Sequence, residues 1–191
     1  MKIILIITLC VVLQPIIGAA QKTGNGKQHI RFHSINQVGV LAGSSDAAIQ
    51  LQTINGLQYK TCFAGIGVGI DYYSVRSIPL FLALRKYIAF KKGFIYGYGD
   101  GGINYVWQRK YDATFQALPT YDNGLYYDIG LGYRFPVNKF GALSLNAGFS
   151  GKEYSSTSEQ VNPCLIPPCP VSKQEFNYSL HRLSFKAGWI F

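Results

Sequence analysis

The sequence predicts an all-β chain whose strands close into an eight-stranded, antiparallel, up-and-down transmembrane β-barrel. An export signal at the N-terminus precedes the rest of the chain. Hydrophobic residues make up 48% and charged residues only 14% of the sequence, against about 25% charged residues in ordinary soluble proteins. Finally, apolar residues alternate with small or polar ones through eight segments, as expected of strands that turn one face toward lipid.

Residues 1–20 are predicted to be a secretory signal peptide. Lys2 is the only charged residue, an apolar run extends from Ile3 to Leu13, and Gly18-Ala19-Ala20 supplies the small residues of a cleavage site. The run is too short for a transmembrane helix, which needs about 20 apolar residues. Cys10 lies inside the run without the small residues that precede a lipoprotein cysteine, so we expect cleavage after Ala20.

The mature chain divides into eight predicted strands, separated by turn residues. These strands are residues 35–42, 47–59, 62–73, 77–90, 94–107, 124–135, 142–154 and 176–191. Asn55-Gly56 is expected to bend the second strand or to start an early turn, and Pro136 is expected to end the sixth. The glycines around Asp100 mark a candidate β-bulge that would exchange the two faces of the fifth strand.

The predicted connections are short on one side and longer on the other. Few residues join the strands near Lys60, at Lys91–Gly93 and at Pro136–Gly141, whereas residues 108–123 and 155–175 form long loops opposite them. Short periplasmic turns and longer extracellular loops are typical of bacterial outer-membrane barrels. The expected organisation is a signal peptide (1–20), a short periplasmic N-terminal tail (21–34) and the barrel (35–191).

The two faces of the predicted strands differ in composition. In the sixth strand, Ile129 and Leu131 lie on one side, and Asp128 and Gly130 on the other. An eight-stranded barrel has an interior just wide enough for side chains, whereas aqueous channels belong to barrels of about 16 strands. We therefore expect a polar network that fills the interior. Its predicted members are Asp71, Arg85, Asp128, Arg134, Arg182 and Lys186.

The last segment alternates aromatic residues on one face, with Phe185, Trp189 and Phe191. This pattern resembles the C-terminal assembly signal of outer-membrane barrels. Together with the signal peptide and the glycine-rich strands at 65–73 and 126–133, it makes residues 35–191 resemble the small bacterial outer-membrane β-barrel family, also described as porin-family proteins. The resemblance implies the fold, the cell outer membrane as location and assembly by the barrel-assembly machinery. It implies no particular activity.

The net charge of +9 favours anionic partners. Because the chain is expected to be exported, nucleic acid is not among them, and lipids of the outer membrane, including lipopolysaccharide, are.

The cysteines are expected to form one disulfide. Cys164 and Cys169 lie close together in a proline-rich loop, and an exported loop is exposed to an oxidising compartment. Cys62 is then a free thiol, facing lipid or lying at the rim. His29 and His33 are four residues apart, but they belong to a glycine-containing tail without a second pair, so no metal site is predicted.

One pair of residues raises the possibility of catalysis. Ser179 and His181 share the lipid-facing side of the last strand, and Asp122 or Glu175 is a candidate acidic neighbour. Some eight-stranded barrels modify lipid A with such a pair, but no distinctive motif surrounds this one. We expect no enzymatic activity and no cofactor. The expected function is a structural or surface-interaction role of the long extracellular loops; the alternatives are a narrow pore for small solutes and a lipid A-modifying enzyme.

Overall fold

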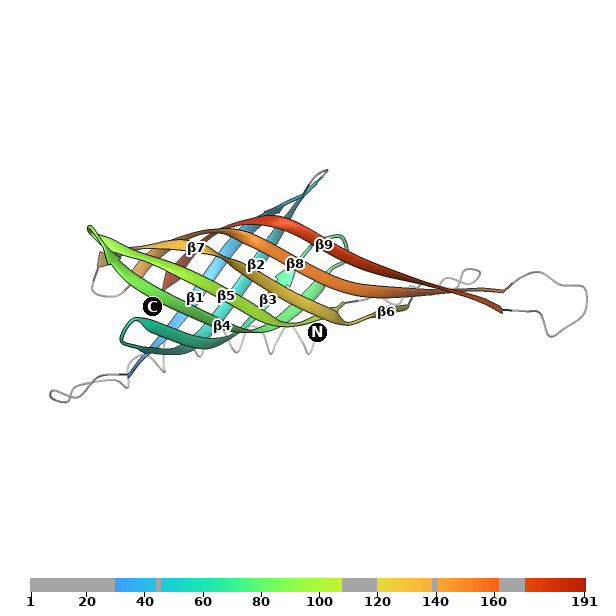
Figure 1. The fold of residues 1–191 in the computed structure, drawn as a ribbon, viewed down its shortest axis with the longest axis horizontal. Coiled ribbons are helices and arrows are strands. Elements are labelled where there is room, and N and C mark those ends of the chain that lie inside the picture. Colours follow the sequence, from blue (N-terminus) through green and yellow to red (C-terminus); the bar gives the residue numbers. More distant parts are fainter. Residues whose placement is uncertain (1–29, 44–45, 108–119, 139–140, 162–170) are drawn as a thin grey trace, which may run out of the picture.

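A computed structural model describes residues 30–43, 46–107, 120–138, 141–161 and 171–191. These residues form nine β-strands, and the eight long ones build a closed barrel (Figure 1). The strands are β1 (Ile30–Ala42), β2 (Ala47–Tyr59), β3 (Cys62–Asp71), β4 (Ser77–Phe90), β5 (Gly93–Val106), β6 (Thr120–Asp122), β7 (Gly124–Asn138), β8 (Gly141–Val161) and β9 (Val171–Ile190).

Every pairing in the sheet is antiparallel, and β9 closes the barrel by pairing with both β8 and β1. The seam between β1 and β9 runs from Ile35 opposite Ile190 to Ala42 opposite Leu183. Beyond it, Ser34 and Phe191 exchange backbone hydrogen bonds of 3.4 and 2.9 Å. The short strand β6 lies outside this ring and pairs with β8 alone among the described strands.

The two ends of the barrel differ as predicted. Short connections after β2 and β4 lie at the end that also carries the start of β1 and the end of β9, here called the turn end. Lys60 and Lys91 adopt left-handed backbone conformations there, with φ of 54° and 50°, which allows the tight reversals. Longer connections lie at the opposite end, here called the loop end.

Burial alternates along the strands in the predicted sense. Leu82 and Ile129 on the outer face are 64% and 62% exposed, whereas Asp128 and Ser144 on the inner face are fully buried. The outer wall is therefore apolar and the interior polar, the reverse of a water-soluble sheet protein. Within the described residues no helix is long and apolar enough to cross a membrane.

Two predictions about the first strands were wrong. Strand β1 begins at Ile30, so residues 30–34, predicted as tail, pair with residues 55–59 of β2. His33 and its neighbours lack an apolar alternation because they lie near the rim, where His33 Nδ1 lies 3.0 Å from the Phe191 carbonyl oxygen. Asn55-Gly56 makes no bend: Gly56 stays in register between β1 and β3, and the Phe63 ring occupies the space a side chain would need.

The fifth strand contains no bulge. Its pairing with β4 and β7 is continuous, and Asp100 faces the interior between Ala83 and Asp128. Gly97, Gly99 and Gly101 therefore lie on the outer face, where an added Cβ would meet nothing within 4 Å.

The later strands are longer than predicted. Strand β7 continues past Pro136 with a shift of register before Asn138. Strands β8 and β9 stay paired from Ser155–Asn177 out to Val161–Val171, where a loop was expected. The Ser- and Thr-rich sequence hid this ribbon, because residues 155–161 show no alternation of apolar and polar residues.

Replacing Ile129 by Arg is expected to impair insertion, because an arginine that faces lipid near the midplane costs about 2–4 kcal/mol. Heat-modifiable gel mobility and urea unfolding in lipid vesicles measure the effect. Ile129→Val serves as the control and should behave as wild type. Normal assembly of Ile129→Arg would contradict the lipid-facing assignment.

Removing Phe191 is expected to slow barrel assembly, because the deletion takes away the two backbone hydrogen bonds with Ser34 that extend the seam. Folding into vesicles, followed by the gel shift over time, provides the rate. Phe191→Tyr retains an aromatic ring and the backbone, so it should assemble normally. An unchanged rate for the deletion would show that the seam does not need its last residue.

Candidate functional site

The interior of the barrel is the candidate site, and the chain's own side chains fill it. The largest fully buried side chains come from strands all around the barrel and from the connection after β3: Phe63, Tyr73, Phe81, Tyr96, Tyr126 and Lys152. Glycine on the inner face makes room for them; an added Cβ at Gly67 would lie 2.3 Å from the Phe81 ring. Large and small residues therefore complement each other across the interior.

An ion pair occupies the middle of the barrel. Lys186 Nζ on β9 lies 2.8 Å from Asp128 Oδ2 on β7, with both side chains at most 1% exposed. Tyr98 and Ser184 donate hydrogen bonds of 2.9 and 3.1 Å to the other oxygen, Oδ1. The carboxylate thus exchanges water for three protein partners, which is the condition under which a buried charge is tolerated.

A second ion pair lies nearer the loop end. Lys152 Nζ on β8 contacts Asp71 Oδ1 on β3 at 2.9 Å and donates to the Ser77 hydroxyl at 2.7 Å. It also donates to the backbone carbonyls of Tyr73 and Val75, each at 2.9 Å. One ammonium group therefore ties β8 to the connection between β3 and β4.

Neutral hydrogen bonds cross the interior beside these charges. Gln52 Nε2 donates to the Tyr126 hydroxyl at 2.7 Å, and Gln37 Nε2 donates to Gln52 Oε1 at 2.5 Å. Asn146 Nδ2 donates to Gln37 at 3.4 Å, and the Tyr96 hydroxyl donates to Asn146. The chain of bonds links side chains of five strands across the interior.

Arg85 and Asp100 are buried charges of a different kind. The Arg85 guanidinium lies over the rings of Phe63, Tyr96 and Tyr98, at 5.7 to 6.0 Å from their centroids. Its Nε and Nη1, and both carboxylate oxygens of Asp100, have no hydrogen-bond partner among the described residues. Cation–π contacts partly offset the desolvation of the guanidinium.

The structure distributes the six predicted network residues over several partners. Asp128 and Lys186 pair with each other, whereas Asp71 pairs with Lys152. Arg182 reaches Asp46 at the loop end at 2.5 Å and lies 4.0 Å from the Tyr73 ring centroid. Arg134 lies over Tyr87 and donates to Gln58 at 3.5 Å.

Sequence reasoning missed three charged participants: Lys152, Asp100 and Asp46. Ser144, Asn146 and Ser150 occupy alternate positions of β8 and face the interior. Lys152 continues this alternation, so the sequence indicated that its side chain faces inward as well. Asp100 was hidden by the ambiguous faces of its glycine-rich strand. Asp46 lies in the connection between β1 and β2, where the alternation of strand residues cannot predict which way a side chain points.

The predicted Ser179–His181 pair lies on the outer face near the loop end. Ser179 Oγ is 3.3 Å from His181 Nε2, and the Tyr127 hydroxyl is 3.1 Å from Nδ1. Phe149 stacks on the imidazole with ring centroids 5.5 Å apart. The ring nitrogens thus face hydroxyl groups and not the candidate carboxylates, within an aromatic cluster of the kind found at membrane interfaces.

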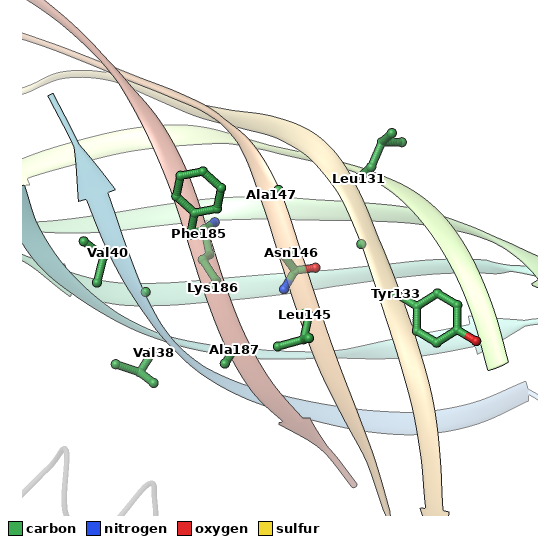
Figure 2. A pocket seen from close by; sticks show the side chains of 12 residues that line it. Val38, Val40, Leu131, Tyr133, Leu145, Asn146, Ala147, Phe185, Lys186 and Ala187 are labelled. Atoms are coloured by element: carbon green, nitrogen blue, oxygen red, sulfur yellow. The ribbon is translucent and has the colours of Figure 1, made fainter. Parts of the chain in front are cut away.

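The outer wall carries shallow hollows. The first, of about 700 Å³, lies over β1, β9, β8 and β7, where the small Ala147 and Ala187 sit between longer side chains (Figure 2). A second, of about 480 Å³, lies over β1 to β4, and a third, of about 580 Å³, lies between Ile30 on β1 and Gly97 on β5.

The remaining predictions concern the cysteines, the histidines of the N-terminal tail and metal binding. Cys62 is free and exposed. The predicted disulfide between Cys164 and Cys169 and the residue His29 lie outside the described residues. In the part of the chain that the structure describes, no three His, Cys, Asp or Glu side chains are grouped to hold a metal ion.

Replacing Lys186 by Met is expected to destabilise the barrel by about 3–5 kcal/mol, because it leaves the Asp128 carboxylate buried without its cation. The double variant Lys186→Met/Asp128→Asn should recover part of this loss, since it removes both charges. Urea unfolding of the wild type, both single variants and the double variant gives the coupling free energy. Additive losses would show that the two groups do not interact.

Comparison with known proteins supports the fold. No protein-family model matches the sequence, and no curated protein does. Among solved structures, the chain is similar to the outer membrane protein AlkL, determined by solid-state NMR in DMPC lipid bilayers, with a TM-score of 0.51 and 13% sequence identity. The similarity covers 90% of this chain and 94% of AlkL. Together with the closed, inside-out wall of eight strands, it shows that the chain has the fold of the small outer-membrane β-barrel proteins.

Proposed function

We propose that the chain is an integral outer-membrane protein whose barrel is a closed, non-conducting anchor and whose projecting ribbon makes contacts at the cell surface. The apolar outer wall, the export signal predicted from the sequence and the similarity to a barrel solved in lipid bilayers support the membrane location. The loop end then faces outward and the turn end faces the periplasm.

The filled interior carries the proposal that the barrel does not conduct. Tyr126 is 1% exposed, packs against Phe81 with ring centroids 5.3 Å apart and accepts a hydrogen bond from Gln52. Asp128 lies two positions after Tyr126 on β7, and its ion pair with Lys186 on β9 fills the adjacent space. A solute would have to break hydrogen bonds and an ion pair in a desolvated interior in order to pass.

The ribbon supports a role in surface interaction. Strands β8 and β9 continue together past the ends of the neighbouring strands (Figure 1). Stacking of Tyr154 on Tyr178, with centroids 4.9 Å apart, and the contact of Tyr121 with Tyr154 at 6.0 Å brace its base. Residues 172–179 are all exposed, and Phe176 is 48% exposed. An exposed aromatic on a braced ribbon suits contact with another molecule.

In planar lipid bilayers the wild-type barrel is expected to give no unitary conductance. The variant Phe81→Gly/Tyr126→Gly removes the central aromatic pair and should conduct, because glycine leaves the lumen open at that level. Trimming the ribbon from Thr157 to Glu175 provides the control and should leave the barrel inserted and closed. Stable conductance steps from the wild type would overturn the anchor proposal and favour a narrow pore.

A further inference from the structure

The third hollow of the outer wall lies at the level of the turn end and has an amphipathic lining. Its volume is about 580 Å³. Outward-facing residues of five neighbouring strands line it: Ile30, Leu57, Tyr59, Cys62, Ala64, Leu84, Lys86 and Gly97. The hollow exists because Cys62, Ala64 and Gly97 are small and lie between longer side chains. It offers apolar walls with one outward-facing cationic group, because Arg85, which also borders the hollow, turns its guanidinium toward the interior rings of Tyr96 and Tyr98.

Lys86 supplies that cationic group. It lies on the outer face of β4, in register with Cys62 on β3 and Gly97 on β5. Its ammonium group donates to the Cys62 sulfur at 3.3 Å, which is a weak and neutral acceptor. Lys60 lies at the adjacent turn, with its ammonium 5.4 Å from the Tyr59 ring centroid.

The whole turn end is basic. Its exposed cations are Arg31, Lys60, Lys86, Lys91 and Lys92. Every described carboxylate side chain lies at mid-barrel or toward the loop end: Asp46, Asp71, Asp100, Asp122, Asp128, Glu153 and Glu175. Apart from the terminal carboxylate of Phe191, no described anionic group lies there. The turn end therefore attracts anions along the side formed by β1 to β5.

These cations lie at the depth where a membrane carries phosphate. Lys60 and Lys91 contact Tyr59 and Phe90, the latter with the ammonium 5.3 Å from the ring centroid. Aromatic side chains that face outward at this end also include Phe135 and Trp189. Such girdles mark the boundary between acyl chains and head groups. The hollow thus spans this boundary, with its apolar walls on the acyl side.

We propose that this hollow binds one anionic phospholipid of the leaflet at the turn end. Its phosphate contacts Lys86, with Lys60 adding attraction, and an acyl chain lies against Leu57, Ala64 and Leu84. The proposal rests on the membrane placement proposed above. Both charge and shape determine which lipid binds. A zwitterionic lipid fits the apolar walls but is attracted less strongly by the cations. Lipopolysaccharide belongs to the leaflet at the other end.

Native mass spectrometry tests the proposal on the full mature barrel released from nanodiscs of equal parts phosphatidylcholine and phosphatidylglycerol. The wild type should retain one phosphatidylglycerol. Lys86→Gln should lower this occupancy about fivefold, since a lysine near a membrane surface contributes about that factor. Gly97→Val should lower it as strongly by filling the hollow, because an added Cβ there meets nothing within 4 Å and the barrel can accept it.

Matched controls separate the site from general effects. Gly101→Val makes the same change on the same face of β5, outside the hollow, where an added Cβ also meets nothing within 4 Å. Arg76→Gln removes an exposed cation at the loop end, one that lies over Tyr72 and Trp107. Both should retain the lipid as wild type does.

Other outcomes overturn the proposal. Equal retention of both lipids would show an apolar groove without selection for charge, and a retained second copy of the chain would show a dimer interface. Equal loss of lipid in Gly101→Val or Arg76→Gln would exclude a local site. Heat-modifiable mobility of each sample reports insertion independently, so failure of the barrel proposal is distinguished from failure of the lipid site.

Discussion

The closed backbone ladder is the constraint on which the rest of the structure depends. A lipid environment offers no partners for amide and carbonyl groups, so an open edge within it costs several kcal/mol for each unsatisfied group. Strand β9 removes the edge by pairing with β8 on one side and β1 on the other. The outward apolar side chains, the polar interior and the position of the aromatic residues all follow from a wall that must be complete in hydrocarbon.

Closure with eight strands also fixes the width of the interior, and the width decides the chemistry inside. There is room for side chains, and charges placed there lose their water. Lys186 and Lys152 are tolerated because each meets a carboxylate and further oxygen acceptors. The interior therefore stabilises one arrangement of strands both through specific ion pairs and through the packing of aromatic rings against small residues.

The sequence predicted the wall better than it predicted the interior or the ribbon. Alternation along residues 77–90 and 124–135 reports the lipid face directly, because outward positions within the wall, such as Leu82 and Ile129, are apolar. Alternation tells only which residues point inward, not which partner each one meets across the barrel, so the pairing of Asp71 with Lys152 could not be read from it. Beyond Tyr154 the sequence does not alternate apolar with polar residues, so the periodic signal disappears although the strand continues.

The seam between β1 and β9 differs from its neighbour in extent. It pairs from Ile35 to Ala42, whereas β8 and β9 pair from Ala142 to Val161. It also joins the first and last strands of the barrel, so among the strand pairings it closes the longest stretch of chain and carries the largest entropic cost. This seam is thus held by fewer backbone pairs than the one beside it, and a force that pulls β1 and β9 apart at the turn end is expected to unzip it one residue pair at a time.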